Sequence, residues 1–269
     1  MARTDRDFEA LLAYVEEELD FATSHYTDAY LDRRVSARQR RTDADSYAEY
    51  HDLLREDREE QAALLDALSI NVTGFFRNPE MWERLRVVLR DLAADHRRLR
   101  LWSAPCADGR EPYSLAMLVL DDPDIDARNV EITATDISED ALDAAREGVY
   151  ETTATTDIAE ELAPIDGAEQ YVDRDGDRFA VRESVRDLVT FRRHDLINGE
   201  PLGPFHAVLC RNLFIYIDPE YKAPILDTVG QSLVEGGVLV VGMTESLTDE
   251  KQSRFEPVEK SVRIHRKIG

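Results

Sequence analysis

A carboxylate stands where a buried strand is predicted to end. The apolar run Val130–Thr135 has the length and composition of a strand, and Asp136 follows it directly, before Ser138 begins a helix as its N-cap. Ligands of parallel sheets bind beyond the carboxyl ends of the strands, where a carboxylate can accept hydrogen bonds from both hydroxyls of a ribose. Asp136 could instead serve only as a loop or capping residue.

A tight turn follows another predicted strand, Leu99–Ala104. The turn contains one glycine, Gly109, and places Pro112 at the first position of a helix. The amino end of a helix beside a tight turn favours an anion such as the carboxylate of a cofactor. A single glycine also occurs in ordinary connections, and it falls short of the GxGxxG pattern that a nicotinamide dehydrogenase needs. Together with Asp136, the turn predicts a nucleoside-binding site.

Two further strand ends bear polar groups. Arg211 and Asn212 follow the predicted strand Phe205–Cys210 and precede another apolar run, which is typical of a pocket floor. The alternative for Arg211 is a side chain that simply leaves the sheet for solvent. The segment His194–Leu196, taken alone, indicates only the end of a strand.

The segment Asn71–Pro79 places two aromatics, a glycine and an arginine between two differently patterned regions. Phe75 and Phe76 are predicted to anchor this segment in the core. Its polar groups are expected to face the interface between two domains, which is a usual location for ligands.

The elements that must position these residues divide the chain into two parts. Helical periodicity predicts a helical domain of about four helices over residues 1–72, followed by a linker over residues 73–78. From 79 to 269, apolar β-rich runs alternate with helical stretches. That alternation predicts an α/β fold with a parallel sheet.

An insertion interrupts the alternation over residues 150–194. A turn signal flanked by apolar residues, among them Val189 and Phe191, predicts a small antiparallel β subdomain there. Near the end of the chain, the weak alternation of Val258–Arg266 predicts one antiparallel edge strand.

Composition excludes several classes of partner. The net charge of -23 repels nucleic acid and anionic lipid. The sequence contains no run of about 18 apolar residues, so no membrane span is predicted. The chain is therefore expected to be cytoplasmic. Cys106 and Cys210 lack the spacing of metal ligands, so they predict buried thiols and no metal site. With only four lysines among 33 basic residues, the composition resembles that of salt-adapted archaeal proteins.

Five motifs, in order, resemble those of the CheR family of chemotaxis receptor methyltransferases. They are Asn71–Arg77, Leu101–Ala104 with Gly109–Ser114, Ala134–Ile137, Cys210–Asn212 with Ile215–Tyr216, and Gly242–Ser246. The resemblance implies a Rossmann-like sheet that binds S-adenosylmethionine (SAM). It also implies an enzyme that transfers a methyl group from SAM to glutamate side chains of chemotaxis receptors, with S-adenosylhomocysteine as the product.

The resemblance implies roles for single residues. Arg77 and Tyr216 would align the acceptor with the methyl group, although Arg77 could instead hold the carboxylate of the cofactor. Asp136 would hold the ribose, and Asp195 would lie beside the adenine. The cofactor-binding set that the resemblance implies is Asn71, Thr73, Arg77, Glu111, Asp136, Asp195, Leu196, Arg211 and Asn212. Family members often have an acidic residue in place of Arg110 and asparagine in place of Asp195.

A basic cluster in this acidic chain predicts a contact with the receptor. Arg33, Arg34, Arg38 and Arg41 lie in a helix predicted over residues 28–41, and much of their charge can share one face. A solvated face paired with neighbouring acids is the alternative. Concentrated positive charge suits docking onto a glutamate-rich helical bundle of the receptor, and the family uses a basic helix in this way.

Two alternatives to receptor methylation stay open, namely a methyltransferase with another acceptor and a SAM-binding module without turnover. A glutamate is ionised at neutral pH, because its pKa is about 4.3, so the reaction needs no general base. The hairpin tip expected at 173–178 is short, which predicts no tether to a receptor's tail peptide. The chain is expected to act as a monomer.

Overall fold

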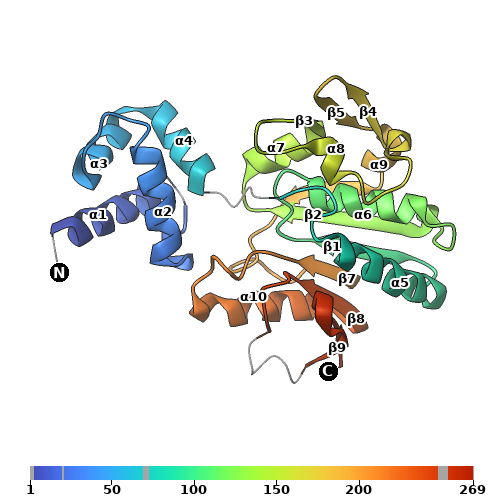
Figure 1. The fold of residues 1–269 in the computed structure, drawn as a ribbon. Helices are drawn as coiled ribbons and strands as arrows, with labels where there is room; N and C mark the ends of the chain where they lie inside the picture. The colour runs from blue at the N-terminus through green and yellow to red at the C-terminus, as the bar shows by residue number, and fades with distance from the viewer. Residues whose placement is uncertain (1–2, 20, 69–72, 248–253, 269) are drawn as a thin grey trace. The chain divides into compact units, whose positions relative to one another are not determined.

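The computed structural model describes residues 3–19, 21–68, 73–247 and 254–268, and the chain forms two compact units (Figure 1). One unit consists of Met1–Ile70 and Tyr216–Lys222, and the other of Asn71–Ile215 and Ala223–Gly269. The first is helical, and the second is built around a sheet. This is the predicted α/β fold with an N-terminal helical part.

Four α-helices form the described N-terminal part of the helical unit. They are α1 (Arg3–Glu18), α2 (Asp28–Gln39), α3 (Tyr47–Glu56) and α4 (Arg58–Leu68). Ser46 caps α3, because its hydroxyl accepts the Glu49 N–H at 3.2 Å. Apolar residues at helical spacing form the core of this unit, among them Leu11, Val15, Leu31, Val35, Leu54 and Leu64. The predicted end of α2 at Arg41 is wrong, since the helix stops at Gln39 and Arg41 lies in the following turn.

The other unit contains a seven-stranded sheet with the order β6-β2-β1-β7-β8-β10-β9. Its strands are β1 (Leu99–Ser103), β2 (Val130–Asp136), β6 (Val189–Arg193), β7 (Phe205–Cys210), β8 (Leu233–Val241), β9 (Phe255–Glu259) and β10 (Ile264–Lys267). The first five in the order pair in parallel, and β10 is antiparallel to both of its neighbours. Because the chain adds β2 on one side of β1 and β7 on the other, the strand order reverses beside β1. Such a switch point is where open parallel sheets bind ligands.

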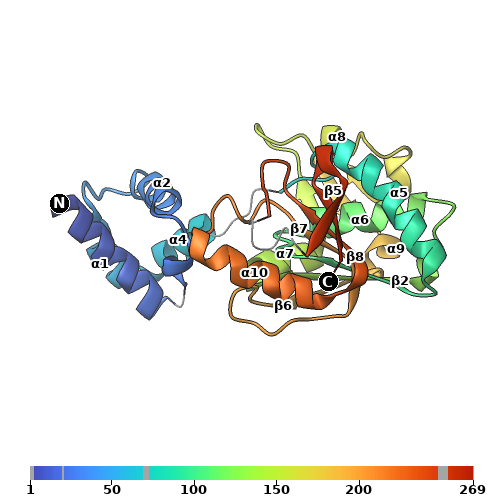
Figure 2. The same ribbon diagram turned by 90° about the horizontal axis from the view of Figure 1, so that it is seen from below.

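The longer helices of this part of the chain are α5 (Pro79–Asp95), α6 (Arg110–Asp121), α7 (Glu139–Glu147) and α10 (Pro219–Ser232). Helix α5 was not among the predicted elements, although its buried apolar residues recur at helical spacing, namely Met81, Trp82, Leu85, Val88, Leu89 and Leu92. Figure 2 shows α5 beside α6. Ion pairs join the two helices, since Arg86 contacts Asp121 at 2.8 Å and Arg90 contacts Asp122 at 2.8 Å.

The inserted subdomain is a three-stranded antiparallel sheet with the order β3-β5-β4. Its elements are β3 (Val149–Glu151), α8 (Ile158–Glu161), β4 (Val172–Asp175), β5 (Arg178–Val181) and α9 (Glu183–Arg186). The predicted hairpin is confirmed, and Gly176 takes a φ of 62° in its turn. The assignment of Val189 and Phe191 to the insertion is wrong, because β6 pairs in parallel with β2 in the main sheet. Alternating apolar residues fit either sheet, and only the long-range pairing distinguishes the two.

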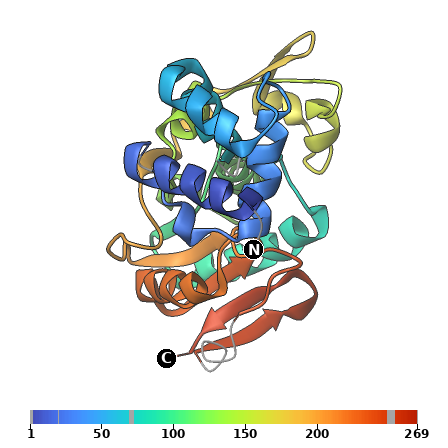
Figure 3. The same ribbon diagram turned by 90° about the vertical axis from the view of Figure 1, so that its left-hand side faces the viewer.

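The end of the chain forms two strands where one was predicted. A 3-10 turn at Lys260–Val262 follows β9, and Arg263 has a φ of 59°, so the chain reverses within the predicted strand. β10 therefore lies between β8 and β9, and the edge strand is β9. Figure 3 shows the last two strands side by side near the C-terminus.

Candidate active site

Backbone contacts shape the turn between β1 and α6. The Cys106 N–H donates to the carbonyl of Thr135 at 2.8 Å, which holds the turn at the end of β2. Gly109 has a φ of 89°, and a Cβ at this position would lie 2.8 Å from the Cβ of Ala145. Both the backbone angle and the close approach therefore require glycine. The result is the predicted helix amino end beside the carboxyl ends of the central strands. The helix begins at Arg110, so the prediction that Pro112 is its first residue is wrong, and Pro112 is its third.

Asp136 holds this turn from the end of β2. Its Oδ2 accepts the Ala107 N–H at 2.9 Å, and its Oδ1 accepts the Ser138 N–H at 3.0 Å. Burial raises the pKa of Asp136 above its usual value, although these backbone hydrogen bonds oppose the rise. Each carboxylate oxygen can accept a second hydrogen bond, so the group can still take the two hydroxyls of a ribose.

A buried ion pair joins α6 to the end of β7. Nη1 of Arg211 lies 2.9 Å from Oε2 of Glu111, and Oε1 of Glu111 accepts the Ser103 hydroxyl at 2.8 Å. Nη2 of Arg211 donates to the carbonyl of Arg77 and to Oδ1 of Asn78, both at 2.9 Å. Burial raises the pKa of Glu111, and the Arg211 guanidinium opposes the rise. The alternative of an Arg211 side chain that leaves the sheet for solvent is therefore wrong, since its guanidinium joins three segments.

Asn212 is held by Glu245, which was not among the predicted site residues. Asn212 has a φ of 59°, and its N–H donates to Oε2 of Glu245 at 2.9 Å. The same oxygen accepts the Gly242 N–H at 2.6 Å, and Glu245 is buried. Glu245 thus fixes the loops that follow β7 and β8. Its place in the motif Gly242–Ser246 was the available signal.

Asp195 and Leu196 follow β6, at the end of the strand next to Asp136. The His194 N–H donates to the Asp136 carbonyl at 2.9 Å, which sets the neighbouring strand ends side by side. Oδ1 of Asp195 accepts the N–H groups of Ile197 at 2.8 Å and of Asn198 at 3.1 Å. Asp195 therefore stabilises its own turn, and Leu196 is buried beside it.

The linker is anchored as predicted. Phe75 and Phe76 are each 2 % exposed, and the Phe76 N–H donates to the Ser114 hydroxyl at 2.9 Å. The carbonyl of Arg77 accepts the Trp82 indole N–H at 3.1 Å in addition to its bond with Arg211. Thr73 lies in the same stretch, whereas the predicted site residue Asn71 lies outside the described residues.

Tyr216, in contrast, packs within the helical unit. Its carbonyl accepts the Thr27 N–H at 3.0 Å, and its ring lies 4.9 Å from the ring of Tyr30. Ile217 forms an antiparallel bridge with Tyr26. The structure therefore places Tyr216 in a different compact unit from Asp136 and Arg77.

The four arginines of the predicted docking face have different surroundings. Arg33 and Arg41 are exposed, and Arg34 is half-buried with its Cζ 5.3 Å from the centre of the Tyr30 ring. Arg38 donates from Nε to Oε1 and from Nη2 to Oε2 of the buried Glu60, at 2.8 and 2.5 Å. The prediction of one shared solvent face is wrong for Arg38, since its guanidinium is bound to the core of the helical unit.

The two cysteines have the surroundings that the sequence predicted. Cys106 and Cys210 are buried free thiols. Among the described residues, no group of three or more histidine, cysteine, aspartate or glutamate side chains could hold a metal ion. In the same part of the chain, no helix combines the length and the apolar character that a membrane crossing requires.

Comparison with known proteins gives two family matches. Residues 71–264 match the model of the CheR methyltransferase SAM-binding domain, and residues 6–69 match that of the CheR methyltransferase all-alpha domain. A chemotaxis protein methyltransferase of Vibrio parahaemolyticus is 37 % identical over 212 residues, covering 75 % of this chain and 76 % of that protein. One from Listeria monocytogenes is 32 % identical over 249 residues, covering 90 % and 91 %.

Proposed function

Because the chain belongs to the CheR methyltransferase family, we propose that its switch point binds SAM through Asp136 and that Arg77 and Tyr216 align the acceptor. The protein is a SAM-dependent methyltransferase that methylates glutamate side chains of chemotaxis receptors. The products are a glutamate methyl ester and S-adenosylhomocysteine.

One observation supports the cofactor site above the others. The buried carboxylate of Asp136 stands at the reversal of strand order, braced by the turn that ends at Gly109. Its two oxygens keep acceptor capacity for a ribose, and the amino end of α6 favours the carboxylate of a cofactor. The donors and acceptors present therefore fit SAM. We assign Asn71, Thr73, Arg77, Glu111, Asp136, Asp195, Leu196, Arg211 and Asn212 to this cofactor.

Within that set, Glu111 and Arg211 act by holding the walls of the site. Their ion pair and the bonds from Arg211 to the linker fix the carbonyl of Arg77. The backbone of Arg77 is thereby set, and we assign its guanidinium a separate role. We propose that this role is the orientation of the acceptor carboxylate.

The chemistry asked of the protein is orientation and exclusion of water. SAM supplies an electrophilic methyl group, and the acceptor glutamate is ionised at neutral pH, since its ordinary pKa is about 4.3. No residue has to remove a proton. Holding the carboxylate oxygen in line with the methyl group can lower the barrier by several kcal/mol. Tyr216 and Arg77 supply a hydroxyl and a cation for this purpose.

Receptor docking is proposed for the exposed part of the basic cluster. Arg33 and Arg41 offer cations to a glutamate-rich helical bundle, with Arg34 partly available beside them. Arg38 contributes by holding the helix in place through Glu60. We further propose that the enzyme acts in the cytoplasm as a monomer.

Transfer of labelled methyl from SAM to a purified receptor fragment tests this function. The expected product loses its label in mild base, because carboxylate esters hydrolyse there, and a receptor with glutamine at its acceptor positions should gain no label. Binding of S-adenosylhomocysteine without any labelled product would indicate a binding module instead. Label that is transferred to another protein and not to receptors would indicate a different acceptor.

A further inference from the structure

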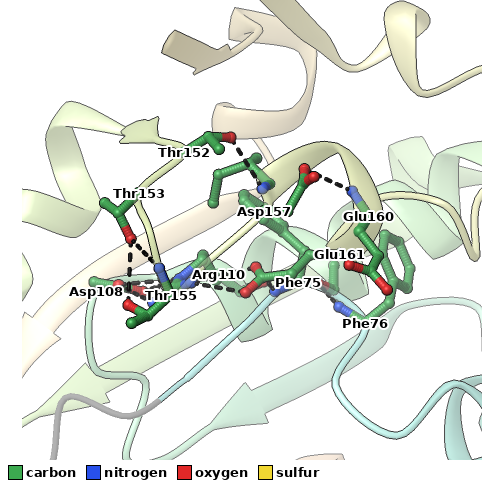
Figure 4. Close-up of polar contacts among 12 residues, drawn as sticks. Phe75, Phe76, Asp108, Arg110, Thr152, Thr153, Thr155, Asp157, Glu160 and Glu161 are labelled. Carbon is green, nitrogen blue, oxygen red and sulfur yellow. Dashed lines mark hydrogen bonds and ion pairs between the residues drawn. The ribbon is translucent and has the colours of Figure 1, made fainter. Parts of the chain in front are cut away.

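Arg110, whose role the sequence left open, lies at the centre of a polar network beside the turn between β1 and α6 (Figure 4). Arg110 occupies the first turn of α6, next to Gly109. Its Nη2 lies 2.9 Å from Oδ2 of Asp108, and its Nη1 lies 3.2 Å from Oε1 of Glu161. A cation at a helix amino end is disfavoured by the helix dipole, so these two carboxylates offset an unfavourable position.

Glu161 connects this arginine to the linker. It ends the short helix α8 of the insertion, and its Oε2 accepts the Phe75 N–H at 2.9 Å. A Cβ on Gly74 would lie only 3.0 Å from Oε1 of Glu161, so the linker backbone passes directly against this carboxylate. One side chain of the insertion thus binds both the turn between β1 and α6 and the linker.

The insertion fixes Glu161 from its other end as well. Asp157 caps α8 by accepting the N–H groups of Ala159 at 2.9 Å and of Glu160 at 3.2 Å, and the Thr152 hydroxyl accepts the Ile158 N–H at 3.2 Å. These contacts set the start of α8, as Figure 4 shows. Since α8 has only four residues, its start also determines where Glu161 lies.

Aromatic contacts close the network. The Tyr150 hydroxyl donates to the carbonyl of Asp108 at 2.6 Å, and the Tyr150 ring meets the Phe75 ring edge-on at 5.0 Å. Cζ of Arg110 lies 5.9 Å from the centre of the same ring. Strand β3 of the insertion therefore contacts the same two segments that Glu161 does.

An exposed salt bridge would contribute little, but this one is shielded. The Arg110 side chain is 12 % exposed, and those of Asp108 and Glu161 are each 23 % exposed. The bond from Phe75 to a carboxylate is also charge-assisted, which makes it stronger than a neutral hydrogen bond. The network can therefore hold backbone segments in place.

We propose that Arg110 and Glu161 are positioning residues for cofactor binding, which clamp the linker of Thr73 and Arg77 to the turn that Asp136 braces. Phe75 lies between the two linker residues, and Asp108 follows Ala107, the donor to Asp136. The insertion thereby helps to build the cofactor site. This inference rests on the proposed cofactor roles of Thr73, Arg77 and Asp136.

Binding of S-adenosylhomocysteine by calorimetry tests the clamp. Glu161→Ala should weaken affinity about tenfold, because it removes two charge-assisted contacts. Glu161→Gln retains an acceptor for the Phe75 N–H and should lose less, about threefold. Glu160→Gln, one residue earlier on an exposed position of the same helix, is the matched control and should bind as wild type does.

Kinetics and a double-mutant cycle separate positioning from general stability. KM for SAM should rise in Glu161→Ala while KM for the receptor stays constant. The double variant Arg110→Gln/Glu161→Gln should bind S-adenosylhomocysteine no more weakly than the weaker-binding single variant, because both substitutions remove the same ion pair. Additive losses, or wild-type affinity in a folded Glu161→Ala, would overturn the clamp. Asp136→Ala distinguishes failure of the clamp from failure of the proposed cofactor site. If Asp136→Ala also binds S-adenosylhomocysteine with wild-type affinity, the cofactor site itself is wrong.

Discussion

Arg38 offers a sharp test of how the helical unit is stabilised. Its guanidinium makes two parallel hydrogen bonds to Glu60, whose side chain is 6 % exposed, and Glu60 also accepts the Tyr50 hydroxyl at 2.5 Å. Arg38→Ala would leave a buried carboxylate with its tyrosine partner alone. The helical unit should therefore lose stability, even though Arg38 belongs to a cluster that the sequence assigned to the receptor.

The size of the loss follows from the burial of the pair. Removing one partner of a buried ion pair costs about 3 to 5 kcal/mol, because the remaining charge is uncompensated. The Arg38 side chain is 22 % exposed, so water can reach Glu60 once the arginine is removed. We therefore expect a loss of stability just below this range, about 2 to 3 kcal/mol. Exposed Arg41→Ala should change stability by less than about 0.5 kcal/mol.

The distribution of tryptophan makes the assay specific. Trp82 and Trp102, the two tryptophans of the chain, both lie in the sheet unit, so tryptophan fluorescence follows that unit during urea unfolding. Far-ultraviolet circular dichroism follows helices in both units. Arg38→Ala should lower the urea midpoint by circular dichroism more than by fluorescence. A midpoint equal to that of wild type would refute the reasoning and return Arg38 to the docking surface.

Other expected outcomes concern the site and the receptor. Asp136→Ala should weaken binding of S-adenosylhomocysteine by at least about tenfold, and equal calorimetric affinity would disprove the ribose assignment. Burial raises the pKa of Asp136, so the affinity of the wild-type protein for S-adenosylhomocysteine should be highest at neutral pH, where the carboxylate is ionised. On acidification, this affinity should begin to fall at a pH above about 3.9, the ordinary pKa of aspartate. An affinity that stays constant down to about pH 4 would contradict this. Arg77→Ala and Tyr216→Phe should fold but transfer methyl at least about tenfold more slowly, and wild-type turnover would remove either from the catalytic pair. Reversing Arg33 and Arg41 to glutamate should lower methylation at limiting receptor without changing SAM affinity, and normal efficiency would exclude docking there.

Local patterns predicted the parts of this fold that local physics decides. The strand that ends at Asp136, the glycine at 109 and the helices of the first 68 residues depend on spacing, capping and turn geometry, all of which are visible within a few neighbours. The main sheet followed from the alternation of elements, and the inserted hairpin followed from its turn signal.

Long-range pairing decided what the sequence could not predict. Glu161 and Arg110 are 51 positions apart in the sequence, and Arg38 and Glu60 are 22 apart. Neither ion pair therefore produces a spacing pattern that can be recognised in the sequence. Likewise, Val189 fits an inserted hairpin and an edge strand equally well by its neighbours. Glu245 was visible only as a motif letter, since its role depends on two loops that meet at the ends of β7 and β8.

The packing of Tyr216 has a consequence for chimeric enzymes. A short stretch of the second half of the chain, Tyr216–Lys222, is built into the helical unit, where Tyr216 contacts Tyr30 and Thr27. If the helices of a relative replaced those of this chain up to the linker alone, they would pack against residues 216–222 of this chain instead of their own. A chimera should therefore acquire the receptor preference of the relative only when residues 216–222 are exchanged together with the helices.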